Sequence, residues 1–351
     1  MDAVLTTMVE DRIGPGEHTQ FLIHTAKEII GFDYCLALRS PVFALQLALE
    51  ALLSRDGDDV DNVDGFKSDI DTVNEKGSRG KGVIISALSP LYYERVIRGL
   101  GLIPLYCDTS DDSPLMAEEK IHALMAAKPL CIIFHHTLGY LPEAEMLAGL
   151  GKSLPVIEDC SQSVWTVLKE KKAGTFGTLA VLGLEEKDMI TAGGGALLFA
   201  ANRRDAALLR SLGELPPEYL LPDLNAAMAA VQFREGEKNL ARRRELAGVY
   251  VEASLHTRHK RFRESEGLEY NNYAFSLVLE SGVKDVKAYA KRKEIAVEQA
   301  FDSTLAGSGA IPSAQCPSAS SLALRTVFFP LYPRLGAQAA DRVTKLIMAL
   351  P

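Results

Sequence analysis

The chain has 351 residues, 47% of them hydrophobic and 24% charged, which predicts a large packed core and excludes wholesale disorder. Its formal net charge of −8 argues against nucleic acid or an anionic membrane as the main partner, because both need a basic footprint. No apolar run reaches the ~18 residues that a membrane span needs, and no signal peptide is recognisable, so we expect a cytoplasmic protein.

Short apolar runs alternate with amphipathic stretches from residue 21 to residue 201. The apolar runs predict strands at 35–40, 82–88, 103–109, 130–137, 155–160, 179–184 and 195–201. The amphipathic stretches predict helices at 42–53, 92–101, 116–127 and 142–152. Because such strands are buried on both faces, the pattern predicts an α/β fold with a mostly parallel sheet between helices.

An acidic, glycine-punctuated stretch at 54–81 interrupts this pattern. It could suggest a calcium loop, but starting from Asp59 the fifth position, where a ligand is required, is Val63. We therefore expect a solvated or disordered surface insertion at this place.

The pattern changes near residue 234. The sequence predicts a long charged helix at 234–255, a strand at 273–280, a helix at 283–294 and a final helix after 326–335. These elements predict a small C-terminal α+β domain at 236–351, after a large domain at 1–235.

Polar residues close several of the predicted strands. Because ligands bind at the carboxyl ends of parallel strands, we expect one rim to hold Ser40, His135, His136 and Asp159. The two histidines could hold a metal or act as a base, but no third ligand stands at metal spacing, so a structural role is favoured. We predict no metal site, and we interpret the five scattered cysteines as reduced core residues.

A lone lysine, Lys187, precedes three consecutive glycines at 193–195, and Gln162 follows three residues after Asp159. Taken singly, Asp159 is equally suited to a helix N-cap, and Lys187 to a solvent-exposed surface. Together they suit pyridoxal phosphate, which needs a lysine for its Schiff base and a carboxylate beside its pyridine nitrogen. Glycines near the lysine allow the backbone to pack closely.

The order of these motifs resembles the nucleotide-sugar aminotransferase family of the DegT/DnrJ/StrS type, which are fold-type-I pyridoxal phosphate enzymes. The matching positions are Asp159, Gln162, the Gly-x-Phe-Gly step at 174–177, Lys187 and the pair Gly194-Gly195. The segments 44–52, 134–147, 224–233 and 328–335 are also similar to segments of the family, so the resemblance covers most of the chain.

The resemblance implies a pyridoxal-phosphate-dependent transferase type I fold, with cofactor binding in the domain at 1–235. It implies transfer of an amino group from an amino acid such as glutamate to a nucleotide-linked keto-sugar, as in polysaccharide biosynthesis. Lys187 would hold the cofactor and move the proton, Asp159 would pair with the pyridine nitrogen, and Gln162 would contact the ring. The family likeness also implies a homodimer in which residues near Tyr219 approach the partner's site.

Several positions that hold the cofactor in the family are different in this chain. The phosphate-binding Gly-Thr pair is replaced by Pro41 and Val42, and a phosphate-binding serine by Leu182. Pro90 stands where the family has an aromatic residue that stacks on the ring. Glu218 and Leu220 replace an asparagine and an arginine that reach the partner's site.

Loss of two or three hydrogen bonds, each worth about 1.5–3 kcal/mol, would weaken cofactor binding by roughly 100-fold or more. Substitutes lie nearby in the sequence: Tyr92 or Tyr93 for stacking, and Ser40 or Ser89 for hydrogen bonding. Two hypotheses follow: an aminotransferase with a modified pocket, or a degenerate homologue with weak or no cofactor binding and a binding or regulatory role.

Overall fold

The computed structural model describes residues 2–9, 13–56, 80–280 and 282–351. Most of the predicted surface insertion at 54–81, including Val63, lies outside the described residues. The two elements that flank it, helix α3 (Pro41–Asp56) and strand β2 (Gly82–Ser86), are both described.

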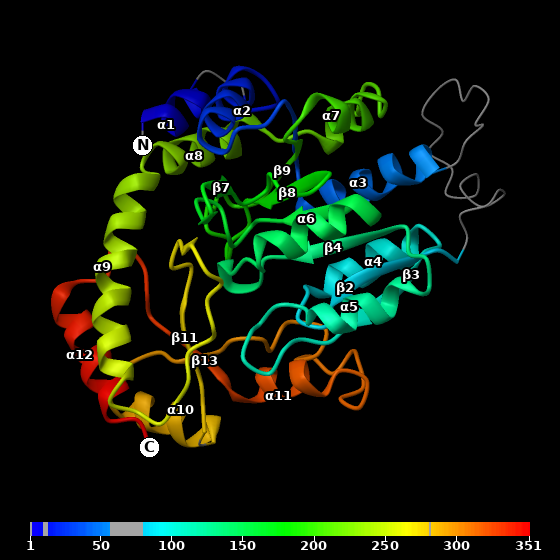
Figure 1. Ribbon diagram of the computed structural model, residues 1–351. Helices are drawn as coiled ribbons and strands as arrows, with labels where there is room; N and C mark the ends of the chain where they lie inside the picture. Colours follow the sequence, from blue (N-terminus) through cyan, green and yellow to red (C-terminus); the bar gives the residue numbers. More distant parts are fainter. Residues whose placement is uncertain (1, 10–12, 57–79, 281) are drawn as a thin grey trace.

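The centre of the molecule is a seven-stranded sheet in the order β1-β9-β8-β5-β4-β2-β3 (Figure 1). Its strands are β1 (Tyr34–Leu38), β2, β3 (Ile103–Cys107), β4 (Cys131–His135), β5 (Val156–Asp159), β8 (Leu179–Gly183) and β9 (Ala196–Ala200). Strand β9 runs antiparallel to both of its neighbours, β1 and β8, whereas the other pairs are parallel. The prediction of an α/β fold with a mostly parallel sheet is confirmed.

Helices cover both faces of this sheet, as the alternation of side chains along β8 shows. Leu179 and Val181 belong to the apolar cluster that includes α3, whereas Ala180 and Leu182 belong to the cluster beneath α2 (Glu17–Ile30) and α8 (Asp223–Arg234). The remaining helices of this part are α1 (Asp2–Val9), α4 (Leu91–Gly99), α5 (Glu118–Met125), α6 (Ala144–Ser153) and α7 (Arg203–Arg210). Burial of both faces explains why the strand sequences are almost wholly apolar.

A second, three-stranded sheet follows the long helix α9 (Gly236–Ser254), which runs along one edge of the molecule (Figure 1). This sheet has the order β11-β13-β12 and consists of β11 (Phe275–Val278), β12 (Glu298–Gln299) and β13 (Thr326–Phe329). The accompanying helices are α10 (Val283–Arg292), α11 (Pro317–Arg325) and α12 (Ala337–Met348). The expected elements at 234–255, 273–280 and 283–294 are therefore present, while the boundary between 235 and 236 stays a prediction.

Smaller elements connect these parts. A minor sheet has the order β10-β6-β7 and consists of β6 (Val167–Leu168), β7 (Lys171–Lys172) and β10 (Leu268–Glu269). The 3₁₀ turns are η2 (Thr137–Gly139) and η3 (Pro217–Tyr219). All five cysteines are buried thiols, and no helix in the described part of the chain is both long and apolar enough to span a bilayer.

Candidate functional site

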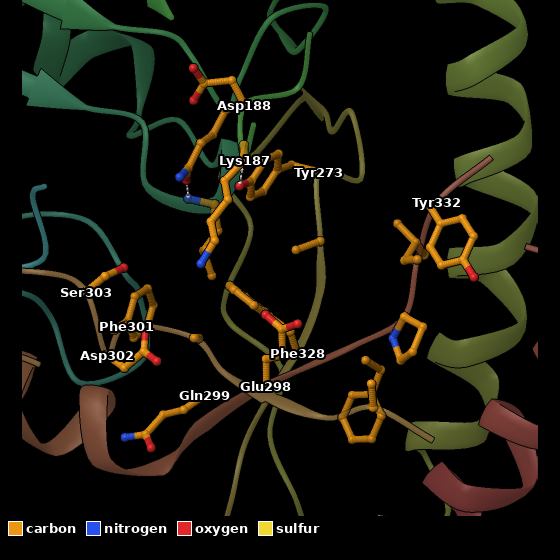
Figure 2. Close-up of a pocket in the computed structure, with 18 of the residues that line it drawn as sticks. Lys187, Asp188, Tyr273, Glu298, Gln299, Phe301, Asp302, Ser303, Phe328 and Tyr332 are labelled. Atoms are coloured by element: carbon orange, nitrogen blue, oxygen red, sulfur yellow. Dashed lines mark hydrogen bonds between the residues drawn. The ribbon is translucent and has the colours of Figure 1, made fainter. Parts of the chain in front are cut away.

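A cavity of about 760 Å³ lies between the carboxyl ends of the central strands and the second sheet (Figure 2). One wall comes from the ends of β2, β4 and β5, with Pro90, His135 and Gln162. The opposite wall comes from the segment around β12 and from β13 and the residues after it. The position of the cavity agrees with the rule that ligands bind at the carboxyl ends of parallel strands.

The predicted cofactor lysine reaches this cavity. Lys187 lies in the loop between β8 and β9, and Figure 2 shows its side chain extending into the cavity while that of Asp188 points away from it. The hydroxyl of Tyr273 donates a 2.5 Å hydrogen bond to the Lys187 carbonyl, which fixes the loop to the start of the second sheet. Within the described part of the chain, the Lys187 amine has no hydrogen-bond or ion-pair partner.

The glycines after Lys187 are required by the backbone of the loop. Gly193, Gly194 and Gly195 all have positive φ, which L-residues rarely adopt. A Cβ atom on Gly195 would also overlap the side chain of Leu221. The glycine run therefore allows the loop that carries Lys187 to turn back tightly into β9.

Asp159 ends β5 as predicted, but its carboxylate is enclosed by other side chains. Its Oδ1 accepts hydrogen bonds from the Ser161 amide (3.0 Å) and the Ser161 hydroxyl (2.5 Å). Its Oδ2 accepts hydrogen bonds from the hydroxyls of Tyr93 (2.5 Å) and Tyr92 (3.5 Å). Asp159 is 3% exposed and is not among the described residues that line the cavity.

Gln162 and His135 lie at the cavity wall in fixed orientations. The Gln162 side-chain oxygen accepts a 2.6 Å hydrogen bond from the Leu138 amide. His135 Nδ1 lies 3.0 Å from the Thr137 hydroxyl. Burial lowers the pKa of His135, although the charge of Asp159 opposes the shift, so the imidazole is neutral at physiological pH.

His136, the other histidine of the predicted rim, faces away from the cavity and is fully buried. Its Nδ1 lies 2.7 Å from the Ser163 hydroxyl and its Nε2 lies 3.3 Å from a Glu158 carboxyl oxygen. Glu158 also accepts hydrogen bonds from the amides of Gly174, Phe176 and Gly177. The serine, histidine and glutamate are each 0% exposed, so the set is structural, and it accounts for the Gly-x-Phe-Gly step.

The positions expected to hold a phosphate lie outside the cavity. The Ser40 hydroxyl accepts a 3.3 Å hydrogen bond from the Phe43 amide at the start of α3, and Pro41, the first residue of that helix, is buried. Leu182 is fully buried in the core. Glu218 lies in η3, and its neighbour Tyr219 packs against Phe43 with ring centroids 4.5 Å apart.

The suggested substitutes do not restore these contacts. Tyr92 and Tyr93 are bound to Asp159, and the buried Ser89 hydroxyl has no hydrogen-bond partner in the described structure and is not at the cavity wall. The site thus fits the covalent end of pyridoxal phosphate, through the Lys187 amine. By contrast, none of the positions that the resemblance assigns to the ring nitrogen or the phosphate is among the described residues that line the cavity.

Comparison with known proteins places the chain among aminotransferases. The model of the DegT/DnrJ/EryC1/StrS aminotransferase family matches residues 70–348. A curated relative, the L-glutamine:2-deoxy-scyllo-inosose aminotransferase of Streptomyces fradiae, is 23% identical over 205 residues, which make up 58% of this chain and 42% of the relative.

Solved structures of aminotransferases have the same fold. An aminotransferase of this family from Brucella abortus matches with a TM-score of 0.83 and 20% identity, covering 99% of this chain and 93% of its own. The sugar aminotransferase CalS13 from Micromonospora echinospora matches with a TM-score of 0.80 and 17% identity, covering 99% and 96%. The DesV protein of S. venezuelae, solved in complex with a ketimine intermediate, matches with a TM-score of 0.83 and 16% identity, covering 99% and 92%.

Proposed function

The chain belongs to the DegT/DnrJ/EryC1/StrS aminotransferase family, and on this premise we propose that it transfers an amino group from an amino acid to a keto group on a sugar-like ring. The observation that carries the proposal is the free amine of Lys187 inside the cavity, on a loop whose glycines allow a tight turn into β9. Lys187 would hold the cofactor through its amine, the group that pyridoxal phosphate chemistry requires of the protein.

Pyridoxal phosphate, when bound, supplies an electron sink for the carbon that loses or gains the amino group. The residues of this chain hold and orient the groups that face the cavity. Tyr273 fixes the Lys187 backbone through its 2.5 Å hydrogen bond, and Gln162 holds the Leu138 turn at the cavity wall. We propose Gln162 as a contact of the ring and Asp159 as the partner of the ring nitrogen, a role that requires one of the donors now bound to Asp159 to give way.

We extend the proposal to a nucleotide-linked keto-sugar as acceptor, glutamate as donor, a cytoplasmic setting and a homodimer with shared sites. These finer statements rest on the sequence resemblance. A second subunit would also bring further side chains to the site.

The decisive test compares Lys187→Ala with the wild-type protein. After incubation with pyridoxal phosphate and borohydride, mass spectrometry should find the reduced adduct on Lys187 in the wild type and none in the variant. Amino transfer from glutamate to keto-sugars should be lost in parallel. Lys120→Ala is the matched control, because Lys120 is an exposed lysine on α5. Transfer that persists without Lys187 would contradict the proposal.

The saturated carboxylate of Asp159 favours a second candidate function. A homologue without catalysis would keep the cleft as a binding site and would not take up the cofactor. Absence of any Lys187 adduct at excess pyridoxal phosphate, in a protein with an intact thermal transition, would select this alternative.

A further inference from the structure

Protein donors occupy both carboxylate oxygens of Asp159. A carboxylate offers about four lone-pair directions, two on each oxygen. Oδ1 receives two donors from Ser161, and Oδ2 receives the hydroxyls of Tyr93 and Tyr92. A protonated ring nitrogen could therefore approach this carboxylate only by replacing one of the four donors.

Tyr93 also connects the carboxylate to the cavity wall. Tyr93 packs edge-on against His135, a residue of the cavity wall, with ring centroids 6.1 Å apart. It packs edge-on against Tyr92 as well, at 5.0 Å. Strand register places His135 directly beside Asp159, so the aromatic rings and the carboxylate occupy adjoining positions at the strand ends.

The two tyrosine hydrogen bonds differ in strength. The Tyr93 bond is short and buried, and Tyr93 is 1% exposed. The Tyr92 bond, at 3.5 Å, is at the outer limit of hydrogen bonding. Burial raises the pKa of both hydroxyls well above their usual range, and the charge of Asp159 adds to the shift, so both remain protonated donors.

We propose that Tyr93 is a positioning residue that competes with the cofactor ring for Asp159, and that it thereby sets the affinity of this chain for pyridoxal phosphate. The inference rests on the proposed function. It gives a specific reason why cofactor binding would be weak: the ring-nitrogen partner is present, but protein donors already occupy both of its oxygens.

Tyr93→Phe is the direct test, since it removes one hydroxyl and keeps the ring that packs against His135. Pyridoxal phosphate affinity is measured by equilibrium dialysis, and occupancy of Lys187 by borohydride fixation and mass spectrometry. A hydrogen bond to a charged group corresponds to about a tenfold change in affinity or more, so Tyr93→Phe should bind the cofactor at least about tenfold more tightly. Tyr92→Phe should change the affinity less.

The melting temperature of the protein without cofactor supplies a second readout that should move in the opposite direction. Tyr93→Phe should lower it, because Asp159 loses a buried donor, although the cofactor binds more tightly. Tyr250→Phe is the matched control: Tyr250 is also fully buried, and within the described structure its hydroxyl donates one hydrogen bond, to the Pro330 carbonyl. The control should lower the melting temperature and leave the affinity unchanged.

The outcomes separate this inference from the proposed function. If Tyr93→Phe and wild type bind equally and both transfer amino groups, the role of Tyr93 is wrong and the function stands. If Tyr93→Phe binds more tightly but neither protein transfers amino groups, the role of Tyr93 stands and the function is wrong. If neither protein takes up the cofactor, removal of Tyr93 does not open the site, and the inference is overturned.

Discussion

The buried carboxyl of Glu158 should make the stability of this protein depend on pH in a defined direction. Burial raises its pKa from 4.5 to about 7, although hydrogen bonds from the amides of Gly177, Gly174 and Phe176 oppose the shift. The pKa of the adjoining His136 is lowered to about 3, mainly by burial, so this imidazole stays neutral. Below pH 7 the contact between the two side chains therefore joins two neutral groups.

The sign of the effect follows from linkage. A carboxyl whose pKa is higher in the folded than in the unfolded state contributes stability that is fully present below pH 4.5 and is lost as pH rises to about 7. At about 1.4 kcal/mol per pH unit, this difference in pKa corresponds to roughly 3 kcal/mol. The group is 0% exposed, so solvent screening does not reduce the figure.

Glu158→Gln removes the titration and keeps the size of the side chain. We expect the variant to be less stable than wild type at pH 5, because a glutamine cannot accept from all three amides. By pH 8 the wild type loses the contribution of Glu158, so the gap between the two proteins should shrink by roughly 2–3 kcal/mol. Urea unfolding at both pH values measures the gap, and every other titrating group is common to both proteins.

Ser163→Ala is the control for this experiment, since it removes the hydroxyl beside His136 Nδ1 without removing a titrating group. Its destabilisation should be nearly the same at pH 5 and pH 8. If the gap between Glu158→Gln and wild type widens at pH 8 instead, Glu158 is ionised in the folded protein throughout, and the reasoning is refuted.

Two further predictions concern the Lys187 loop and the assembly. Gly195→Ala should lower the free energy of unfolding by about 2–5 kcal/mol in urea unfolding, because it combines positive φ with overlap at Leu221. Gly213→Ala also has positive φ, but its Cβ would meet no atom within 4 Å, so it should cost only about 1–2 kcal/mol. Equal costs would show that packing at Leu221 is unimportant. Light scattering at micromolar concentration should give the mass of a homodimer, and a monomer would count against shared sites.

The sequence was sufficient for the fold because the relevant signals are local. Each central strand is an apolar run bounded by polar or glycine residues. The predicted limits of each strand lie within a few residues of the observed ones, as in 130–137 against Cys131–His135. The helices that were not predicted from periodicity, such as Arg203–Arg210 and Pro317–Arg325, are short and lie after the regular alternation ends. Their positions depend on packing partners far along the chain.

The candidate site was predictable in part for the same reason. Lys187 and its glycines lie within nine residues, so their spacing is visible in the sequence, and their arrangement in the loop agrees with it. The rim prediction correctly brought His135 and Asp159 together but also included His136, which alternation along the chain turns to the opposite side, toward Glu158. Two adjacent residues at a strand end face opposite ways, and the choice between them requires the structure.

The enclosure of Asp159 could not be read from the sequence, because it depends on contacts between distant segments. Tyr93 is 66 positions away from Asp159 and belongs to α4, and only the docking of that helix against the sheet brings its hydroxyl to the carboxylate. The sequence suggested Tyr92 and Tyr93 as substitutes for a stacking ring, because residue identity shows an aromatic ring but not what its hydroxyl contacts. The structure instead uses their hydroxyls, and the difference matters chemically: a stacked ring would add to cofactor binding, whereas a hydroxyl on Asp159 competes with it. The presence of a carboxylate at a motif position therefore does not establish a free acceptor, and in this chain two hydroxyls of α4 and one serine occupy the oxygens of Asp159.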